Sequence, residues 1–424
     1  MHIKHITIQN FRGIHSLDIE FGSNINLFIG ENGAGKSTII NAIRILLSWL
    51  LARIRNKNGR GIQLTEADIS KGQDFCLMEI RLNNNCKWRL VKKRQSHRSK
   101  VNVTTNLNEL NETAEQILFE YAIGENGKHL PIVANYGVNR AITDIPVKPS
   151  KTDHSLPYNF YDIQLQNNVR FKNFFEWYIE QENIDNANYR YQKEYIPDPQ
   201  LNAVRKAFET IMPEYNNLRV KRKPLKFIVD KDDMEFNINE LSDGEKCYLI
   251  LVADIARQLA IANPNKKNPL EGDGIVMIDE IDLHLHPQWQ TEIVEKLKST
   301  FHNCQFFITT HSPFIVSSVQ SQKEDHLYIM RQGYTIQIHD NAYGMYVNEI
   351  LTSFFGMNTL RNKEIQKHID IIWDELARGN YSSEKFTNNL SWLKENLNDS
   401  DMEFAHINLE RTLLMKQGKK DETN

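Results

Sequence analysis

The sequence predicts an α/β fold: a mixed sheet around a phosphate-binding loop, with a mainly helical insertion and a helical C-terminal extension. Up to Phe21 the chain alternates apolar and polar side chains, as half-buried strands do, and the apolar run INLFIG then predicts a central strand. From Ser37 apolar residues recur every three or four positions, which indicates a helix. Two short apolar runs, 275–278 and 305–309, are typical of buried parallel strands.

Further elements follow along the chain. Residues 75–95 alternate again and predict a hairpin that turns at Asn83–Asn85, because Asn tolerates left-handed dihedral angles. Three prolines and little periodicity mark residues 142–160 as the start of an insertion. Aromatic residues at helical spacing should then form the insertion's own core, with base stacking or a dimer contact as alternatives. These residues are Phe171, Phe174, Phe175 and Tyr178.

After residue 360 the pattern becomes helical, with Gly379 placed as the stop of the first helix and Ser400–Glu403 as a capping box. Apolar stripes run along the first two helices at Ile369, Ile372, Trp373, Leu390, Leu393 and Leu397. We expect residues 360–415 to dock a partner protein. The alternative is that the stripes cover one another or the rest of the chain.

These elements divide the chain into four parts. They are an N-terminal lobe with the glycine loop (1–141), the insertion (142–230), the second part of the head (231–345) and the helical extension (346–424). A predicted helix over residues 241–262 opens the second part of the head. No internal repeat or coiled-coil heptad is evident.

Composition excludes several classes of protein. The 424 residues carry 51 Lys and Arg against 54 Asp and Glu, so the net charge of -3 gives no global attraction to nucleic acid or anionic membranes. No apolar run reaches the length of a membrane helix and no signal peptide opens the chain, so we expect a cytoplasmic protein without a membrane partner. The cysteines lack a CxxC spacing, which favours a reducing compartment and argues against zinc. They are Cys76, Cys86, Cys247 and Cys304.

The glycine loop GENGAGKS, residues 30–37, matches the phosphate-binding pattern GxxxxGK[ST]. In this pattern backbone amides and the lysine hold phosphates, and the serine hydroxyl reaches Mg²⁺. The loop also opens a helix whose N-terminal N–H groups favour anions; the alternative is a plain glycine turn. We therefore expect the cofactors ATP and Mg²⁺ here. The binding residues would be Gly30, Asn32, Gly33, Gly35, Lys36, Ser37 and Thr38.

Polar groups end two later strands. The run 275–278 is followed by Asp279, which can hold Mg²⁺ together with Ser37, and by Glu280, which can polarise the water that attacks the γ-phosphate. The run CQFFITTHSP reaches His311, which could contact the γ-phosphate from a neighbouring strand. Glu280 and His311 are therefore the catalytic candidates, although paired acids can merely begin a loop and a lone histidine is often structural.

The segment LSDGEK, residues 241–246, decides the class of ATPase. It resembles the LSGGQ/E signature of ABC-type ATPases, with Asp243 in place of the first glycine. In that family the serine hydroxyl and the glycine amides act on nucleotide held by the other subunit. The resemblance therefore implies that Ser242 and Gly244 bind ATP across a homodimer or a higher homo-oligomer. Asp68, within TEADI, is a candidate for the Gln-loop role of the same family.

The opening of the chain narrows the resemblance. Ile6–Gly13 follows the pattern IxIxNFRG and resembles the start of SMC, Rad50-like and RecF proteins, in which the arginine equivalent to Arg12 lies near the nucleotide. Residues 279–287 resemble the DEPExxLHP pattern of OLD-type ATPases, although Asp282 replaces a glutamate and His286 stands where SMC proteins have an aspartate. The lack of heptads excludes long SMC arms. Transporter ATPases fit poorly, because they lack the FRG and LHP elements.

Nuclease chemistry is not expected in this chain. OLD-type nucleases carry a C-terminal Toprim domain with clustered acids that begin with a Glu after an apolar strand. After His311 Asp340 is present, but no such strand and Glu followed by a strand with paired acids is evident. The segments LPIVANYGVNR (130–140) and FFEWY (174–178), with LHPQWQ and the helical C-terminus, resemble PtuA-type ATPases of Septu and retron-associated anti-phage systems. That resemblance implies an ATPase that regulates a separate HNH nuclease subunit. The alternative is a RecF-like DNA-binding repair ATPase or clamp loader without a nuclease partner.

Two basic runs are candidates for DNA contact through phosphates. Residues 81–108 hold eight Lys or Arg and no acid, and residues 219–226 hold five and no acid. The candidate contacts are Lys92, Lys93, Arg94, Lys221, Arg222 and Lys223. The alternative is that both runs are solvated faces.

Overall fold

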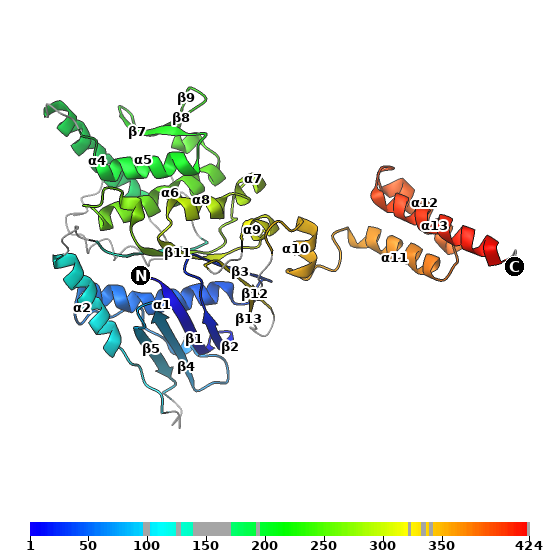
Figure 1. Ribbon diagram of the computed structural model, residues 1–424, viewed down its shortest axis with the longest axis horizontal. Helices are drawn as coiled ribbons and strands as arrows, with labels where there is room; N and C mark the ends of the chain where they lie inside the picture. The colour runs from blue at the N-terminus through cyan, green and yellow to red at the C-terminus, as the bar shows by residue number, and fades with distance from the viewer. Residues whose placement is uncertain are drawn as a thin grey trace. The chain divides into compact units, whose positions relative to one another are not determined.

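The computed structural model describes residues 1–95, 102–123, 129–138, 171–191, 196–320, 324–331, 336–338 and 342–421. The predicted start of the insertion, residues 142–160, lies outside these ranges. The chain forms two compact units, Met1–Ile350 and Leu351–Asn424 (Figure 1). The predicted nucleotide-binding motifs all lie in the first unit.

A four-stranded antiparallel sheet forms one layer of the first unit, in the order β2-β1-β4-β5. Ile6, Ile8 and Leu17 point into the core, and the β4–β5 hairpin turns at Asn85 with a φ of 65°, so the predicted alternation and hairpin are confirmed. The strands are β1 (Ile3–Phe11), β2 (Ile14–Glu20), β4 (Phe75–Leu82) and β5 (Lys87–Lys93).

A six-stranded sheet forms the second layer, in the order β13-β12-β3-β11-β10-β6, with β13 antiparallel to its neighbour and the others parallel. Every residue of β3, β6, β10 and β11 is buried, as their mainly apolar sequences predict. Because these strands are parallel, the loops that follow β3, β10 and β11 leave the same edge of the sheet. The strands are β3 (Ile25–Gly30), β6 (Ile132–Tyr136), β10 (Gly274–Ile278), β11 (Cys304–Thr309), β12 (His326–Met330) and β13 (Ile336–Ile338).

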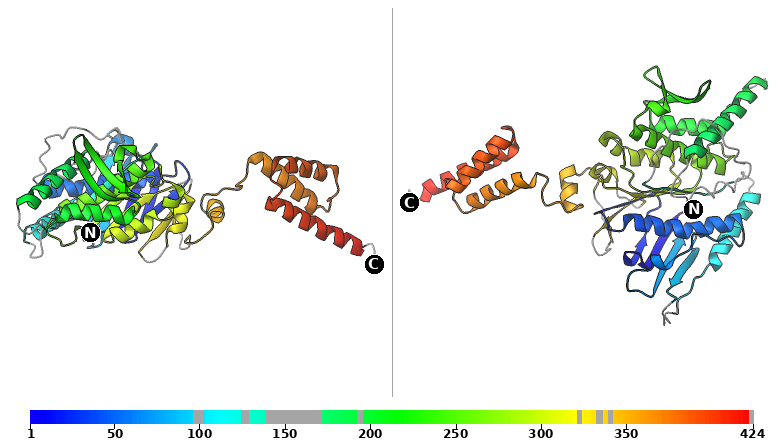
Figure 2. Two further views of the ribbon diagram at one scale, coloured as in Figure 1. Left: turned by 90° about the horizontal axis from the view of Figure 1, so that it is seen from above. Right: turned by 180° about the vertical axis from the view of Figure 1, so that it is seen from behind.

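Helix α1 (Lys36–Arg55) lies between the two sheets (Figures 1 and 2). Trp88 of β5 donates its indole N–H to the carbonyl of Leu46 at 3.1 Å, which ties the helix to the antiparallel sheet. By length and composition α1 could cross a membrane, contrary to the expectation that no apolar run is long enough. However, 61% of its most apolar window is buried inside the protein, as suits a helix covered on both sides.

Helices cover the other face of the six-stranded sheet (Figure 1). Helix α6 (Asp243–Ala262) packs against β6, and α5 (Pro199–Ile211) packs on α6 and α8 (Ile293–Thr300). The other described helices of this unit are α2 (Asn108–Ile123), α4 (Phe171–Tyr191), α7 (Pro287–Gln290) and α9 (Pro313–Ser318), with 3₁₀ turns at Glu66–Asp68, Ile238–Glu240 and Pro269–Glu271. Helix α10 (Val347–Ser353) spans the boundary between the two units.

The aromatic residues of α4 pack on a three-stranded sheet that the sequence analysis did not predict. Phe174, Phe175 and Tyr178 are buried, and the ring of Phe175 lies 4.5 Å from that of Phe227, which confirms their role as a local core. The side chain of Phe171 lies outside the described part of the chain. The sheet is ordered β7-β8-β9, with β7 at Asn216–Arg222, β8 at Leu225–Lys231 and β9 at Met234–Asn237.

The second unit consists of α11 (Lys363–Ala377), α12 (Glu384–Asn396) and α13 (Met402–Asp421). The apolar stripes of α11 and α12 face each other and, with Phe404 and Ile407 of α13, form one core. The expectation that these stripes dock a partner is therefore wrong, because each helix buries its stripe against the other two. Gly379 follows α11 as predicted.

Replacing Ile372 by alanine should loosen the second unit. Ile372 is fully buried, and removing such a side chain costs about 2–5 kcal/mol of unfolding free energy. Hydrogen exchange measured by mass spectrometry should become faster in α11–α13 and stay unchanged in α1. Leu409→Ala is the control, since Leu409 is 61% exposed; equal exchange in both variants would contradict the observed core.

Candidate functional site

The glycine loop connects β3 to α1 and encloses the ammonium group of Lys36. Lys36 is buried, and its Nζ donates to the carbonyl oxygens of Gly30 at 2.8 Å and Glu31 at 3.0 Å. Gly30 has a φ of 141°, and a Cβ there would lie 2.1 Å from the carbonyl of Met330, so the turn requires glycine. Asn32 and Gly33 are exposed at the loop surface. Further along, the N–H of Thr38 bonds to the carbonyl of Gly35 at 3.0 Å.

The charge of Lys36 is balanced by acids from another strand. Burial lowers the pKa of Lys36, while the negative charges of Glu280, Asp279 and Asp282 oppose that shift. The acids after β10 therefore lie within electrostatic reach of the loop that follows β3. The structure thus brings together two motifs that the sequence predicts to share one site.

Ser37 and Asp279 form the direct contact between these motifs. The hydroxyl of Ser37 donates to Asp279 Oδ1 at 3.1 Å. The same carboxylate oxygen accepts from the hydroxyl of Thr309 at 2.6 Å. Thr309 in turn accepts from the N–H of Glu280 at 2.7 Å, and Glu280 has a left-handed φ of 50°, which is uncommon for a residue other than glycine.

Two threonines that the sequence analysis did not single out join the acids to the histidine loop. Thr309 holds Asp279 and Glu280, and Thr310 donates its hydroxyl to Asp282 Oδ1 at 2.5 Å. The N–H of His311 approaches the same oxygen at 3.3 Å. The signal in the sequence is the TTHS run, whose hydroxyls follow directly on a buried strand.

His311 lies close to the cation and the acids of the site. Burial lowers the pKa of His311, the charge of Lys36 lowers it further, and Asp282, Glu280 and Asp279 oppose this. His311 is therefore neutral at pH 7, with one ring nitrogen as donor and the other as acceptor. A neutral imidazole can donate a hydrogen bond to a phosphate without adding a second buried cation.

The signature-like segment begins helix α6. Ser242 is the N-cap of this helix and forms a capping box with Glu245. The Ser242 hydroxyl donates to Glu245 Oε2 at 2.7 Å, and the backbone N–H of Glu245 donates to the Ser242 hydroxyl at 3.3 Å. In the part of the chain that is described, these are the only hydrogen bonds of the Ser242 side chain. Gly244 packs against the loop after β10, where a Cβ would lie 2.1 Å from the carbonyl of His284.

The three-stranded sheet reaches this capping box. The hydroxyl of Tyr215 donates to Glu245 Oε1 at 2.5 Å, and Lys231 lies 3.9 Å from the same carboxylate. Burial opposes ionisation of Glu245, but the hydrogen bonds from Tyr215 and Ser242 lower its pKa overall. The glutamate is thus ionised and held in place next to Ser242.

Arg12 and Asp68, both singled out in the sequence, form an ion pair. Arg12 Nε donates to Asp68 Oδ1 at 3.0 Å, and the backbone N–H of Arg12 bonds to the carbonyl of Asp68 at 2.8 Å. Thr65 donates to the other carboxylate oxygen at 2.9 Å. Burial lowers the pKa of Arg44 of α1, and the charge of the nearby Arg12 lowers it further.

The basic runs are partly neutralised. Lys221 pairs with Glu235 at 2.9 Å and Arg222 pairs with Glu182 at 2.9 Å. In the first run Arg94 donates to the backbone carbonyls of Gln73 and Ile69, whereas Lys92 and Lys93 lie half-buried at the end of β5. Lys223 is exposed at the β7–β8 turn. The second run is therefore engaged within the protein to a large extent.

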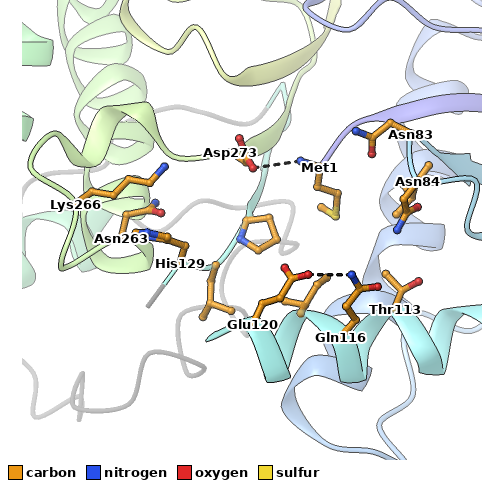
Figure 3. A pocket seen from close by; sticks show the side chains of 14 residues that line it. Met1, Asn83, Asn84, Thr113, Gln116, Glu120, His129, Asn263, Lys266 and Asp273 are labelled. Atoms are coloured by element: carbon orange, nitrogen blue, oxygen red, sulfur yellow. Dashed lines mark hydrogen bonds and ion pairs between the residues drawn. The ribbon is translucent and has the colours of Figure 1, made fainter. Parts of the chain in front are cut away.

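A separate hollow of about 290 Å³ lies at the opposite edge of the six-stranded sheet, where β6 and β10 begin (Figure 3). Asp273 points into it and pairs with the amino group of Met1 at 3.4 Å. Across the hollow, Gln116 donates to Glu120 at 2.9 Å. Its described lining residues include none of the predicted nucleotide-binding residues, so the hollow and the nucleotide loop are different sites.

Comparison with known proteins identifies similar ATPases. Residues 1–316 match the family model described as AAA ATPase domain. The chain is 28% identical to the Retron Ec83 probable ATPase of Escherichia coli, over 97% of this chain and 86% of that protein. It is 31% identical to the Retron Vc95 probable ATPase of Vibrio cholerae serotype O1 biovar El Tor, over 76% and 72%. It is 24% identical to the Septu protein PtuA of Bacillus thuringiensis, over 85% of each chain.

Lys36→Ala should abolish nucleotide binding without unfolding the protein. The substitution removes the cation around which the loop is wrapped, and loss of a charge partner of a phosphate weakens binding by about 100-fold or more. Isothermal titration with ATP measures the affinity. Lys57→Ala removes an exposed lysine paired with Glu115 and is the control; ATP affinity of Lys36→Ala equal to that of the control would contradict the assignment.

Glu280→Gln should keep ATP binding and slow hydrolysis by about 100-fold or more, because the amide cannot activate the attacking water. Phosphate release and ATP binding are measured on the same preparation. Hydrolysis at the wild-type rate would show that Glu280 does not act on the water.

Proposed function

Because the chain belongs to the AAA ATPase domain family, we propose that two copies close head to head around ATP in the cytoplasm and regulate a partner HNH nuclease that cleaves DNA. The chain itself is an ATPase. Its retron and Septu relatives are consistent with an ATPase of anti-phage defence. The similarity to the retron relative of Escherichia coli extends over 97% of this chain, which favours this role over that of a RecF-like clamp loader.

The contact between Ser37 and Asp279 is the observation that carries the nucleotide-binding part of the proposal. A hydroxyl and a carboxylate 3.1 Å apart suit Mg²⁺, which prefers oxygen ligands, so Ser37 and Asp279 would hold the ion. When bound, Mg²⁺ would neutralise charge on the β- and γ-phosphate oxygens. Lys36 would hold the same phosphates from the other side, and the exposed loop amides would donate to them.

Hydrolysis would depend on Glu280 and His311, which both lie within electrostatic reach of Lys36. Glu280 would orient the water and draw its proton, and neutral His311 would donate to the γ-phosphate. Thr309 supports this arrangement, because one hydroxyl contacts both the Asp279 carboxylate and the Glu280 backbone.

A second copy would complete the site. Ser242 is exposed at the start of a 20-residue helix, and its resemblance to the ABC signature implies action on nucleotide held by another subunit. The helix N-terminus favours an anion there. Release of the Ser242 hydroxyl from Glu245 would free it to donate to the γ-phosphate of the partner.

The nuclease would dock on α13. Met402, Leu409 and Leu413 lie on one face of this helix and are 73%, 61% and 46% exposed, while Phe404 and Ile407 pack inward. An exposed apolar helix face suits insertion into a groove of a partner. DNA contact through Lys221 and Arg222 is disfavoured, because their charges are balanced by acids (Glu235 and Glu182).

Ser242→Arg should spare ATP binding and stop hydrolysis, because the bulky cation replaces the hydroxyl that would meet the partner's γ-phosphate. Mixed with Lys36→Ala, it should regain part of the activity, since one composite site then contains an intact loop and an intact signature. Phosphate release from the two variants alone and mixed is the measurement. Full activity of Ser242→Arg alone would rule out the sandwich dimer.

Leu409→Asp with Leu413→Asp should abolish co-purification of an HNH protein encoded beside this chain and leave ATP hydrolysis unchanged. Two carboxylates on the exposed face oppose burial against an apolar groove. Glu410→Gln on the same helix is the matched control. Undiminished capture would move the interface elsewhere, and an ATPase without any nuclease neighbour would favour the RecF-like alternative.

A further inference from the structure

Asp282 stands two residues after Glu280 and accepts two hydrogen bonds from the loop that carries His311. Both donors, the Thr310 hydroxyl at 2.5 Å and the His311 N–H at 3.3 Å, approach Oδ1. The carboxylate therefore contacts the backbone of the histidine and not its ring. Besides the effect of its charge on the pKa of His311, Asp282 acts on the ring through the position of the loop.

Thr310 gives this contact a rigid base. Its side chain is buried, and its hydroxyl also accepts from the N–H of Ser312 at 2.9 Å. Its own N–H bonds to the carbonyl of Phe28 in β3 at 3.2 Å. Asp282 is thus attached to a residue that is fixed both to the central strand and to the next turn of the histidine loop.

A second row of hydrogen bonds joins the same two loops. The N–H of Ile281 bonds to the carbonyl of Thr309 at 3.0 Å, and the N–H of Glu280 bonds to the Thr309 hydroxyl at 2.7 Å. Asp282 follows this row and lies half-buried. Further along, the Ser312 hydroxyl donates to Gln290 Oε1 of α7 at 2.6 Å, so the two segments also meet beyond Asp282.

We propose that Asp282 is a positioning residue that sets the distance between His311 and Glu280, and so aligns the two groups that act on the γ-phosphate and the water. The proposal rests on the proposed function of the nucleotide site. Without Asp282 the histidine loop would lose the carboxylate that holds the Thr310 hydroxyl and the His311 N–H, and the imidazole would move relative to Glu280. A displacement of about 1 Å can lower a rate by about 100-fold while leaving substrate binding intact.

Asp282→Ala should lower kcat by about 10- to 100-fold and change the KM for ATP by less than about threefold. Asp282→Asn should keep kcat within about threefold of the wild type, because its amide oxygen can accept both hydrogen bonds. Thr310→Val should behave like Asp282→Ala, Thr310→Ser should restore activity, and the double variant Asp282→Ala with Thr310→Val should be no slower than either single variant.

Asp18→Ala is the matched control, since Asp18 accepts a threonine hydroxyl at 2.6 Å in the antiparallel sheet. Wild-type kcat in Asp282→Ala, or equal losses in Asp282→Ala and Asp282→Asn, would overturn the proposal, because the latter pattern indicates a role for charge. Thermal melts identify variants that fail to fold, and Thr310→Val then carries the test. If Lys36→Ala and Glu280→Gln still hydrolyse ATP, the nucleotide site itself is wrong and this proposal fails with it.

Discussion

The hydrogen bond between Ser37 and Asp279 joins positions 242 residues apart, and the rest of the candidate site depends on it. Ser37 follows β3 and Asp279 follows β10, yet these strands are not neighbours, because β11 lies between them. The end of β11 supplies Thr309, whose hydroxyl contacts Asp279 and the backbone of Glu280. The strand order therefore lets Thr309, at the end of the strand between them, hold both acids while Ser37 contacts Asp279 directly.

Asp279, at the end of β10, is linked to the signature helix α6 through a buried polar network. The N–H of Asp279 bonds to the carbonyl of Tyr136 at 2.8 Å, and the hydroxyl of Tyr136 donates to Asp254 of α6 at 2.9 Å. Asp254 is almost fully buried and is paired with Arg257 at 2.7 Å, as a buried carboxylate requires. Gly244 at the start of helix α6 packs on the loop after β10. Helix α6 is therefore attached to the region around Asp279 at two places, Gly244 and Asp254. A change at the bound nucleotide would thereby reach Ser242, which we propose acts on the nucleotide of a second copy.

Much of this arrangement could be predicted from the sequence. Continuous apolar runs predicted β3, β10 and β11, and the polar residues that follow each of them were expected to act on the same nucleotide. The bridging threonines were missed because a hydroxyl has no distinctive spacing, and its role appears only when two strands become neighbours. The three-stranded sheet was missed because its strands are short and charged, and Tyr215 reaches Glu245 only through tertiary packing. The stripes of α11 and α12 were misassigned because periodicity shows that a face must be covered and does not show by what.

A structure of Glu280→Gln with ATP and Mg²⁺ tests the central claim most directly. The account predicts that Ser37 and Asp279 would hold Mg²⁺, that the phosphates would lie on the loop around Lys36, and that Ser242 of a second copy would lie beside the γ-phosphate. ATP bound in the hollow at the opposite edge of the sheet, or on the loop without Ser242 of a second copy, would contradict it.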